Sequence, residues 1–242
     1  MKNVIERNNG KLLTSIVVST LAAFVGNADA SMISVATGHS TAGVQASAEA
    51  YKNVVEAAVA GATAGYGTAS PAVFNDISNH GLFGANSIYD IAFDFTIRFG
   101  VTPAQAGAWE FRAGTDFGLG GAVFIDGVAL GFKTNDMWWA GSYGNPSQYF
   151  DYSSLLAAGN HVLQIYGLEH CCDGGQQAQF RAPGATFFTT FSSTDGLAAI
   201  PEPATFRTFG SRDGLAAIPE PATFALFGIG LLGLGAARRR KQ

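Results

Sequence analysis

Apolar and polar side chains alternate without an error over residues 91–99. The apolar positions hold only isoleucine and phenylalanine, and the positions between them hold alanine, aspartate, threonine and arginine. A two-residue period is that of a strand, because successive side chains point to opposite faces of a sheet. The pattern predicts a strand with one face in a core and the other in water.

Shorter runs of the same kind follow. Residues 109–113 alternate, and two apolar triplets at 123–125 and 128–130 flank Asp126-Gly127, a pair suited to the positive φ angles of a tight hairpin turn. Further strands are predicted at 161–168, 178–182 and 185–191. Short strands separated by turn residues predict a mainly β fold, a β-sandwich or jelly roll.

One helical pattern precedes the strands, over residues 41–60. Its larger apolar side chains recur on one helical face: Val44, Tyr51, Val55 and Val59. Gly61 is a suitable residue to end a helix. We expect this helix to pack against the domain that follows.

The N-terminus has the pattern of a secretory signal peptide. Lys2, Arg7 and Lys11 form a basic region, residues 12–26 are apolar, and Ala28-Asp29-Ala30 is a small-x-small cleavage site. We expect cleavage after Ala30, so that the mature chain begins at Ser31.

The C-terminus has a second ordered pattern. Pro219, Glu220 and Pro221 precede an uncharged apolar run at 222–237, and a basic end follows: Arg238, Arg239, Arg240 and Lys241. As a helix this run would be about 24 Å long, slightly short for a hydrocarbon core of roughly 30 Å. The basic end would stay on the cytoplasmic side, which leaves the rest of the chain outside.

This order of prolines, apolar run and basic end resembles the PEP-CTERM sorting signal of Gram-negative bacteria that make exopolysaccharide. The resemblance implies an exported protein whose tail is removed by an exosortase, a membrane-embedded transpeptidase, after a transient association with the inner membrane. A plain single-pass membrane anchor is the alternative interpretation.

The net charge of the part expected to be exported limits the classes of molecule that it can bind. Residues 31–218 hold 7 Lys and Arg against 15 Asp and Glu, a formal charge of −8. An acidic domain does not suit nucleic acid or anionic lipid, whereas calcium and neutral glycans both remain compatible with it.

The chain therefore divides into five predicted parts. They are the signal peptide (1–30), a helix-containing segment packed on the domain (31–87), the β-sandwich (88–191), a linker (192–217) and the sorting signal (218–242). The linker contains the first copy of a tandem repeat, because the 12 residues 195–206 recur without change at 213–224.

Three segments of the predicted sandwich, 109–116, 122–128 and 156–167, resemble the β-sandwich of the anthrax protective antigen and of yeast flocculation adhesins. The resemblance covers residues 88–191. In its adhesin members, paired aspartates hold calcium, which in turn holds the sugar. Thr115-Asp116 supplies a single carboxylate at that position. The loop 114–121 is better interpreted as a turn, so we predict neither a metal site nor a cofactor.

Cys171 and Cys172 are the only cysteines. With Gly174 they resemble a Cys-Cys-x-Gly subgroup of sorting-signal proteins. Cysteines with no other partner in an oxidising compartment should pair, which predicts a disulfide between neighbours. Three roles stay open: a stiffened turn, a hydrophobic platform for a ligand, and an intermolecular bridge or free thiols.

One aromatic cluster can contact a sugar. Trp138, Trp139 and Tyr143 precede further aromatic residues at 149, 150 and 152, and Asp136 lies beside them as a hydrogen-bonding group. The alternative is that these rings fill the core.

Catalysis has little support. The four histidines are scattered, and none has a carboxylate at a spacing that suggests a relay. We therefore expect a non-enzymatic, exported protein of the cell surface or exopolysaccharide matrix, structural or adhesive. The alternatives are a specific glycan-binding lectin-like module and, with less support, a secreted polysaccharide-active enzyme.

Overall fold

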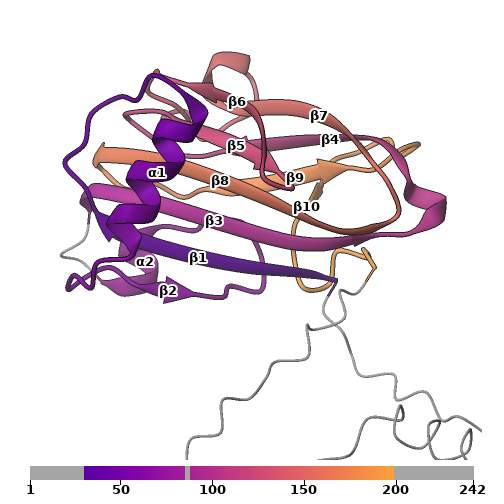
Figure 1. Cartoon of the computed structure of the whole chain (residues 1–242), viewed down its shortest axis with the longest axis horizontal. Coiled ribbons are helices and arrows are strands. Elements are labelled where there is room, and N and C mark those ends of the chain that lie inside the picture. The colour runs from indigo at the N-terminus through magenta and orange to yellow at the C-terminus, as the bar shows by residue number, and fades with distance from the viewer. Residues whose placement is uncertain (1–29, 85–87, 199–242) are drawn as a thin grey trace, which may run out of the picture. The chain divides into compact units, whose positions relative to one another are not determined.

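A computed structural model describes residues 30–84 and 88–198 of the chain. The predicted signal peptide, apart from its last residue Ala30, and the predicted sorting signal at 218–242 lie outside these residues. The described part is mainly β, with two sheets and one main helix, as the residue pattern predicts (Figure 1).

Six strands form the larger sheet, in the order β2-β1-β3-β8-β5-β6. All its pairings are antiparallel. Its strands are β1 (Ser31–His39), β2 (Thr68–Ala69), β3 (Tyr89–Val101), β5 (Gly121–Ile125), β6 (Val128–Lys133) and β8 (Gly159–Cys171).

Four strands form the second sheet, in the order β10-β9-β4-β7, again antiparallel. They are β4 (Gly107–Gly114), β7 (Phe150–Leu156), β9 (Gln177–Arg181) and β10 (Thr189–Thr190). Short helical elements complete the fold: α2 (Asn79–Phe83), η1 (Pro103–Gln105) and η2 (Pro146–Gln148).

The main core lies between the two sheets and is rich in aromatic rings. The buried side chains of β3 alternate as the two-residue period predicts, and they meet Trp109 and Phe111 of β4. Ring contacts join the two sheets, with centroids 5.7 Å apart between Phe99 and Trp109 and 5.9 Å apart between Phe99 and Phe111. Pairs at these separations stabilise beyond the area that they bury.

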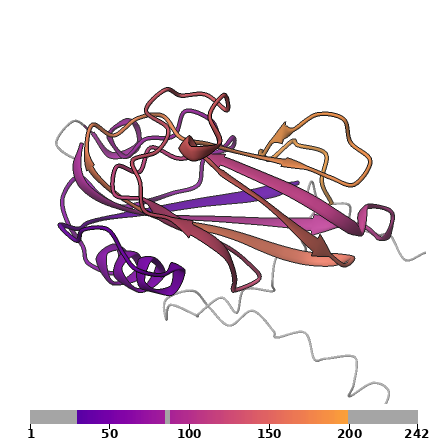
Figure 2. The same ribbon diagram turned by 90° about the horizontal axis from the view of Figure 1, so that it is seen from above.

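The main helix α1 (Ala48–Val59) lies across the outer face of the six-stranded sheet (Figure 2). Tyr51 and Val55 are buried there, in a second cluster that includes Ala92 of β3. The prediction that the second face of β3 is wet was therefore wrong at Ala92, because the helix covers it.

The helix begins later than predicted, at Ala48 instead of Thr41. The Ser47 hydroxyl accepts a hydrogen bond from the Ala50 amide at 3.1 Å, and such an N-cap satisfies an amide that the first turn leaves free. Val44 lies outside the helix and is 51% exposed, so its place on the helical face was wrong.

The hairpin at Asp126-Gly127 is confirmed. Its two residues have φ angles of 51° and 78°, between β5 and β6. The strand expected at 185–191 is reduced to Thr189–Thr190, since Ala185 closes a turn with Ala182. The His161 ring lies between the Asp126 carboxylate, at 2.7 Å, and the Ala157 carbonyl, at 2.9 Å, which is a structural role.

Strands β1, β2 and β7 were not predicted. The register of β1 runs along β3 from Ser31, opposite Phe99, to His39, opposite Ile91, within the larger sheet. Its serine, alanine and glycine residues give little contrast between apolar and polar positions, so the two-residue period is weak there.

The fold also extends beyond residue 191. Leu197 is only 8% exposed, and Ala198 forms a bridge with Gly100, so residues 192–198 belong to the packed structure and not to a free linker. Among residues 30–84 and 88–198, no helix is both long and apolar enough to cross a membrane.

Candidate ligand-binding pocket

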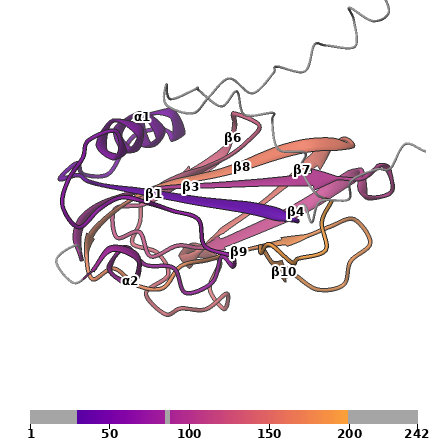
Figure 3. The ribbon, with the colours of Figure 1, turned by 90° about the horizontal axis from the view of Figure 1, so that it is seen from below.

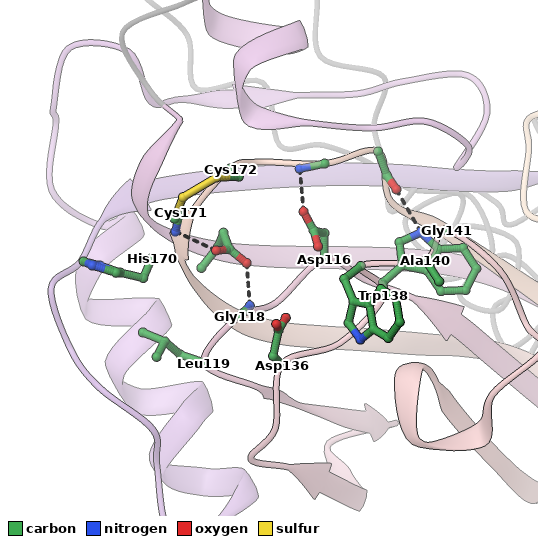
Figure 4. Close-up of a pocket in the computed structure, with 14 residues that line it drawn as sticks. Asp116, Gly118, Leu119, Asp136, Trp138, Ala140, Gly141, His170, Cys171 and Cys172 are labelled. Atoms are coloured by element: carbon green, nitrogen blue, oxygen red, sulfur yellow. Dashed lines mark hydrogen bonds between the residues drawn. A yellow bond between two sulfur atoms is a disulfide. The ribbon is translucent and has the colours of Figure 1, made fainter.

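A pocket of about 810 Å³ lies between three loops. The first follows β4, the second follows β6, and the third continues from the end of β8 (Figure 4). Its polar and aromatic lining comes from all three: Asp116, Asp136, Trp138, Trp139, Glu169, His170, Cys171 and Cys172. Glycines, Leu119 and Ala140 complete the lining.

A disulfide between the neighbours Cys171 and Cys172 forms one side of this pocket. Both residues are exposed, and the Cys172 amide donates to the Ile88 carbonyl at 3.1 Å. The disulfide is therefore a surface of the pocket and not part of the core.

Two carboxylates hold the disulfide turn against the loop after β4. Glu169 accepts hydrogen bonds from the Gly118 amide and, at 2.7 Å, from the Cys171 amide. Asp116 accepts one from the Gly174 amide at 2.7 Å. Figure 4 draws these bonds, which give the turn two anchoring points on the β4–β5 loop.

Burial raises the pKa of both carboxyl groups. The pKa of Glu169 rises to about 7, chiefly through burial, although the amides that bind it oppose the rise. The pKa of Asp116 rises to about 6, again chiefly through burial, opposed by the Gly174 amide and increased by Asp136 and Asp173. Both groups therefore titrate near neutral pH.

Trp138 and Trp139 have opposite environments. Trp138 is 4% exposed and packs on Tyr143, with ring centroids 4.7 Å apart, while its indole nitrogen donates to the Gly175 carbonyl. Gly114 of β4 allows this approach, because a Cβ there would lie 2.3 Å from the Trp138 ring. Trp139 is 69% exposed, so its face is available to a ligand.

Two residues of the pocket have unusual backbone conformations. Five non-glycine residues in the described ranges have positive φ, and three of them are aspartates, which tolerate this region. The other two are Trp138 (φ 64°) and Cys172 (φ 72°), and both line the pocket. Such conformations persist where the surrounding structure imposes them, and they concentrate at functional sites.

The structure brings together most of the residues singled out in the sequence. Asp136, Trp138, Trp139 and the Cys171–Cys172 pair line one pocket, although 32 positions separate Trp139 from Cys171. Tyr143 does not line the pocket and packs against Trp138 instead. The Arg112 guanidinium carbon lies 3.9 Å from the centroid of the Tyr143 ring. Other rings of the aromatic cluster, Tyr149 and Phe150, are buried in the core.

Asp116 and Glu169 were missed as pocket residues. Asp116 lies in the glycine-rich segment that was interpreted as a plain turn, and Glu169 lies within a strand. Nothing in their local sequence indicates that the ends of β4 and β8 meet. The predicted sorting residues Pro219, Glu220, Pro221, Arg238, Arg239 and Arg240 fall outside the described residues.

The pocket does not fit calcium. A calcium ion takes six to eight oxygen ligands, and Asp116 and Glu169 already accept backbone amides. Within the described ranges no group of three or more His, Cys, Asp or Glu side chains is arranged to hold a metal ion.

This chain is similar to several solved structures at low sequence identity. It is similar to the PA14 sugar-binding domain of an RTX adhesin, with 13% identity, a TM-score of 0.45 and coverage of 69% of this chain and 97% of that one. It is also similar to the PA14 domain of the antifreeze protein MpAFP, with 11% identity, a TM-score of 0.44 and coverage of 77% and 94%.

A third similar structure is the Epithelial Adhesin 9 A domain of Candida glabrata in complex with Galb1-4GlcNAc. Identity is 10%, the TM-score is 0.41, and the match covers 69% of this chain and 89% of that one. Likenesses at this level carry no information on function.

The C-terminal segment has a match of its own. Residues 217–241 match the PEP-CTERM protein-sorting motif, which includes the predicted Pro-Glu-Pro and basic end. A search of proteins with curated functions found no match to this sequence.

Proposed function

We propose that this chain is an exported protein of a Gram-negative cell surface or exopolysaccharide matrix, with an adhesive, non-enzymatic role. The match of residues 217–241 to the sorting motif supports export and processing by an exosortase. The resemblance of Cys171, Cys172 and Gly174 to the Cys-Cys-x-Gly pattern supports membership of that subgroup of sorted proteins.

We propose in addition that the pocket binds one sugar unit of a matrix polysaccharide. The observation that carries this proposal is the exposed ring of Trp139 in a pocket that also holds Asp116 and Asp136. Aromatic faces stack on the C–H surfaces of sugars, and a few polar groups then set the orientation of the ring.

The disulfide suits the same ligand. Its two sulfur atoms give the pocket a second weakly polar surface, and Figure 4 draws Asp116 and Asp136 between it and Trp138. A sugar ring has apolar C–H faces and a polar rim of hydroxyl groups, and this pocket offers partners for both.

A glycan array probed with the purified chain, with and without calcium, tests this function. We expect binding to neutral glycans that is independent of calcium and is lost in Trp139→Ala. The matched control is Phe187→Ala, which removes another ring that is 79% exposed but does not line the pocket. Failure of the unchanged protein to bind any glycan would leave a structural role and contradict the pocket proposal.

A further inference from the structure

The last described segment, residues 188–198, closes the domain. It contains β10, which pairs with β9 at one edge of the four-stranded sheet (Figure 3). Phe191 is fully buried and Leu197 is 8% exposed, and both belong to the main core. The sandwich is therefore complete only when this segment is in place.

Backbone hydrogen bonds hold the segment in a groove that is formed by residues 72–74 on one side and by Ala178 of β9 on the other. The Phe74 amide donates to the Phe191 carbonyl at 2.9 Å, and the Phe191 amide donates to the Ala178 carbonyl at 3.2 Å. The Ser193 amide donates to the Ala72 carbonyl at 2.8 Å. These bonds involve the main chain, so they depend little on which side chains the segment carries.

A tight turn joins the two buried residues. Asp195 accepts hydrogen bonds from the Ser192 and Leu197 amides, each at 3.1 Å. Gly196 has φ 83°, a conformation that glycine adopts more readily than any other residue. A segment that replaced this one would need an aspartate and a glycine at the same two places.

The sequence contains such a segment 18 positions further on. Residues 206–216 repeat residues 188–198, and the shared residues include every side chain used above: Phe206, Thr208, Phe209, Ser211, Asp213, Gly214, Leu215 and Ala216. Two of the three differences, at 207 and 212, replace Thr189 and Thr194, which are exposed. The third, Gly210 in place of Ser192, keeps the main-chain contacts with Asp195 and Ser31 and loses one bond, from the Thr194 amide to the Ser192 hydroxyl at 3.3 Å.

We propose that the groove beside β9 accepts either segment, 188–198 or 206–216, of the same chain. The exchange lengthens the connection from Arg181 to the closing segment from 6 residues to 24. The free-energy cost of closing a loop grows as (3/2)RT times the logarithm of its length. A loop about fourfold longer therefore lowers the population of the second segment in the groove by about eightfold. About one molecule in nine then carries the second segment in the groove.

The exchange changes the distance between the domain and the sorting signal. With 188–198 in the groove, 20 residues separate Ala198 from Pro219, whereas with 206–216 in the groove only two residues separate Ala216 from Pro219. An exosortase would then have to act close to the folded domain. This consequence rests on the proposed sorting function, but the exchange itself does not.

Paired variants of the full chain test the exchange by urea unfolding. We expect the double variant Phe191→Asp with Leu197→Asp to stay folded, because residues 206–216 take the place of residues 188–198 in the groove. Its unfolding equilibrium constant should be about eightfold higher than that of the unchanged protein. The matched variant, Phe209→Asp with Leu215→Asp, should differ little from the unchanged protein. All four substitutions together should abolish the cooperative transition. If the first pair alone abolishes it, the proposal is wrong.

Trypsin provides a second readout. No lysine or arginine lies between Arg181 and Arg207, so Arg207 and Arg212 report on the second segment. In the Phe191→Asp, Leu197→Asp variant these two sites should become resistant, and the resistant fragment should extend past Arg212 by mass. A folded variant cut there at the unchanged rate overturns the proposal. A dimer in that variant would place the segment in a second chain and also overturn it, while failure of sorting alone would leave it intact.

Discussion

The indole nitrogen of Trp138 donates a hydrogen bond to the Gly175 carbonyl at 3.0 Å. This bond joins the loop after β6 to the turn that follows the disulfide. Two loops that are distant in the sequence are thereby held as the walls of one pocket, and Trp139, the next residue, is left exposed. Trp138 therefore has a structural role, whereas Trp139 is the ring on which the proposed glycan binding depends.

We expect Trp138→Ala to destabilise the domain by about 3–5 kcal/mol, the usual cost of removing a large buried aromatic side chain. Trp139→Ala should leave the free energy of unfolding within about 0.5 kcal/mol of the unchanged value, since its ring is mostly exposed. Urea unfolding measures both. Equal destabilisation by the two variants would contradict the assignment of Trp138 to the core.

The disulfide should be present in the exported protein. Alkylation before reduction should add no label by intact mass, and alkylation after reduction should add two. Because the loop closed by neighbouring residues is minimal, chain entropy contributes little, and replacing both cysteines by serine should cost about 1 kcal/mol or less. Loss of glycan binding at an unchanged melting temperature would assign the pair to the binding surface; unchanged binding would assign it to the turn alone.

Stability should depend on pH through Glu169. Its pKa is about 7 in the folded chain against an ordinary 4.5, so between these values the folded state keeps a proton that the unfolded state releases. The free energy of unfolding should therefore fall as the pH rises from about 4.5 to about 7, by at most about 1.4 kcal/mol per pH unit from this group.

The variant Glu169→Gln isolates that contribution, since glutamine does not titrate. Its free energy of unfolding should vary less with pH over the same interval. Arg181→Gln with Glu110→Gln, which removes an ion pair on the second sheet, is the control and should leave the slope near that of the unchanged chain. An unchanged slope in Glu169→Gln would remove Glu169 as its source.

Sorting should depend on the second Pro-Glu-Pro and not on the first. Changing Pro219, Glu220 and Pro221 to alanine should block tail removal, and so should deletion of the basic residues 238–241. The same change at Pro201, Glu202 and Pro203 should have no effect, because a charged segment and not an apolar run follows them. Mass measurement of the exported form decides, and the reverse result would show that the first copy is the signal.

At the other end, the mature chain should begin at Ser31, which is also the first residue of β1. N-terminal sequencing of the exported protein checks this. Detection of Met1 in that form would show that the leader is retained.

The sequence by itself determined the elements whose pattern is local. The alternation at 91–99 and the Asp126-Gly127 turn predicted β3 and the β5–β6 hairpin, since side-chain period and turn chemistry depend only on near neighbours. The motif at 217–241 is likewise readable without a fold. The weak alternation of β1 and the aromatic residues of β7 hid those strands, because their faces are defined only by the sheets that they join.

Only the tertiary structure decided the pocket. Asp116 and Trp139 come from two loops and Cys171 from the end of β8. No spacing in the chain shows that antiparallel pairing brings the ends of β4, β6 and β8 together. It also decided which rings are buried, since Trp138 and Trp139 differ only in how the backbone turns between them. The place of residues 188–198 was decided in the same way. Their repeat is visible in the sequence, but the groove that residues 188–198 fill exists only after distant strands have paired.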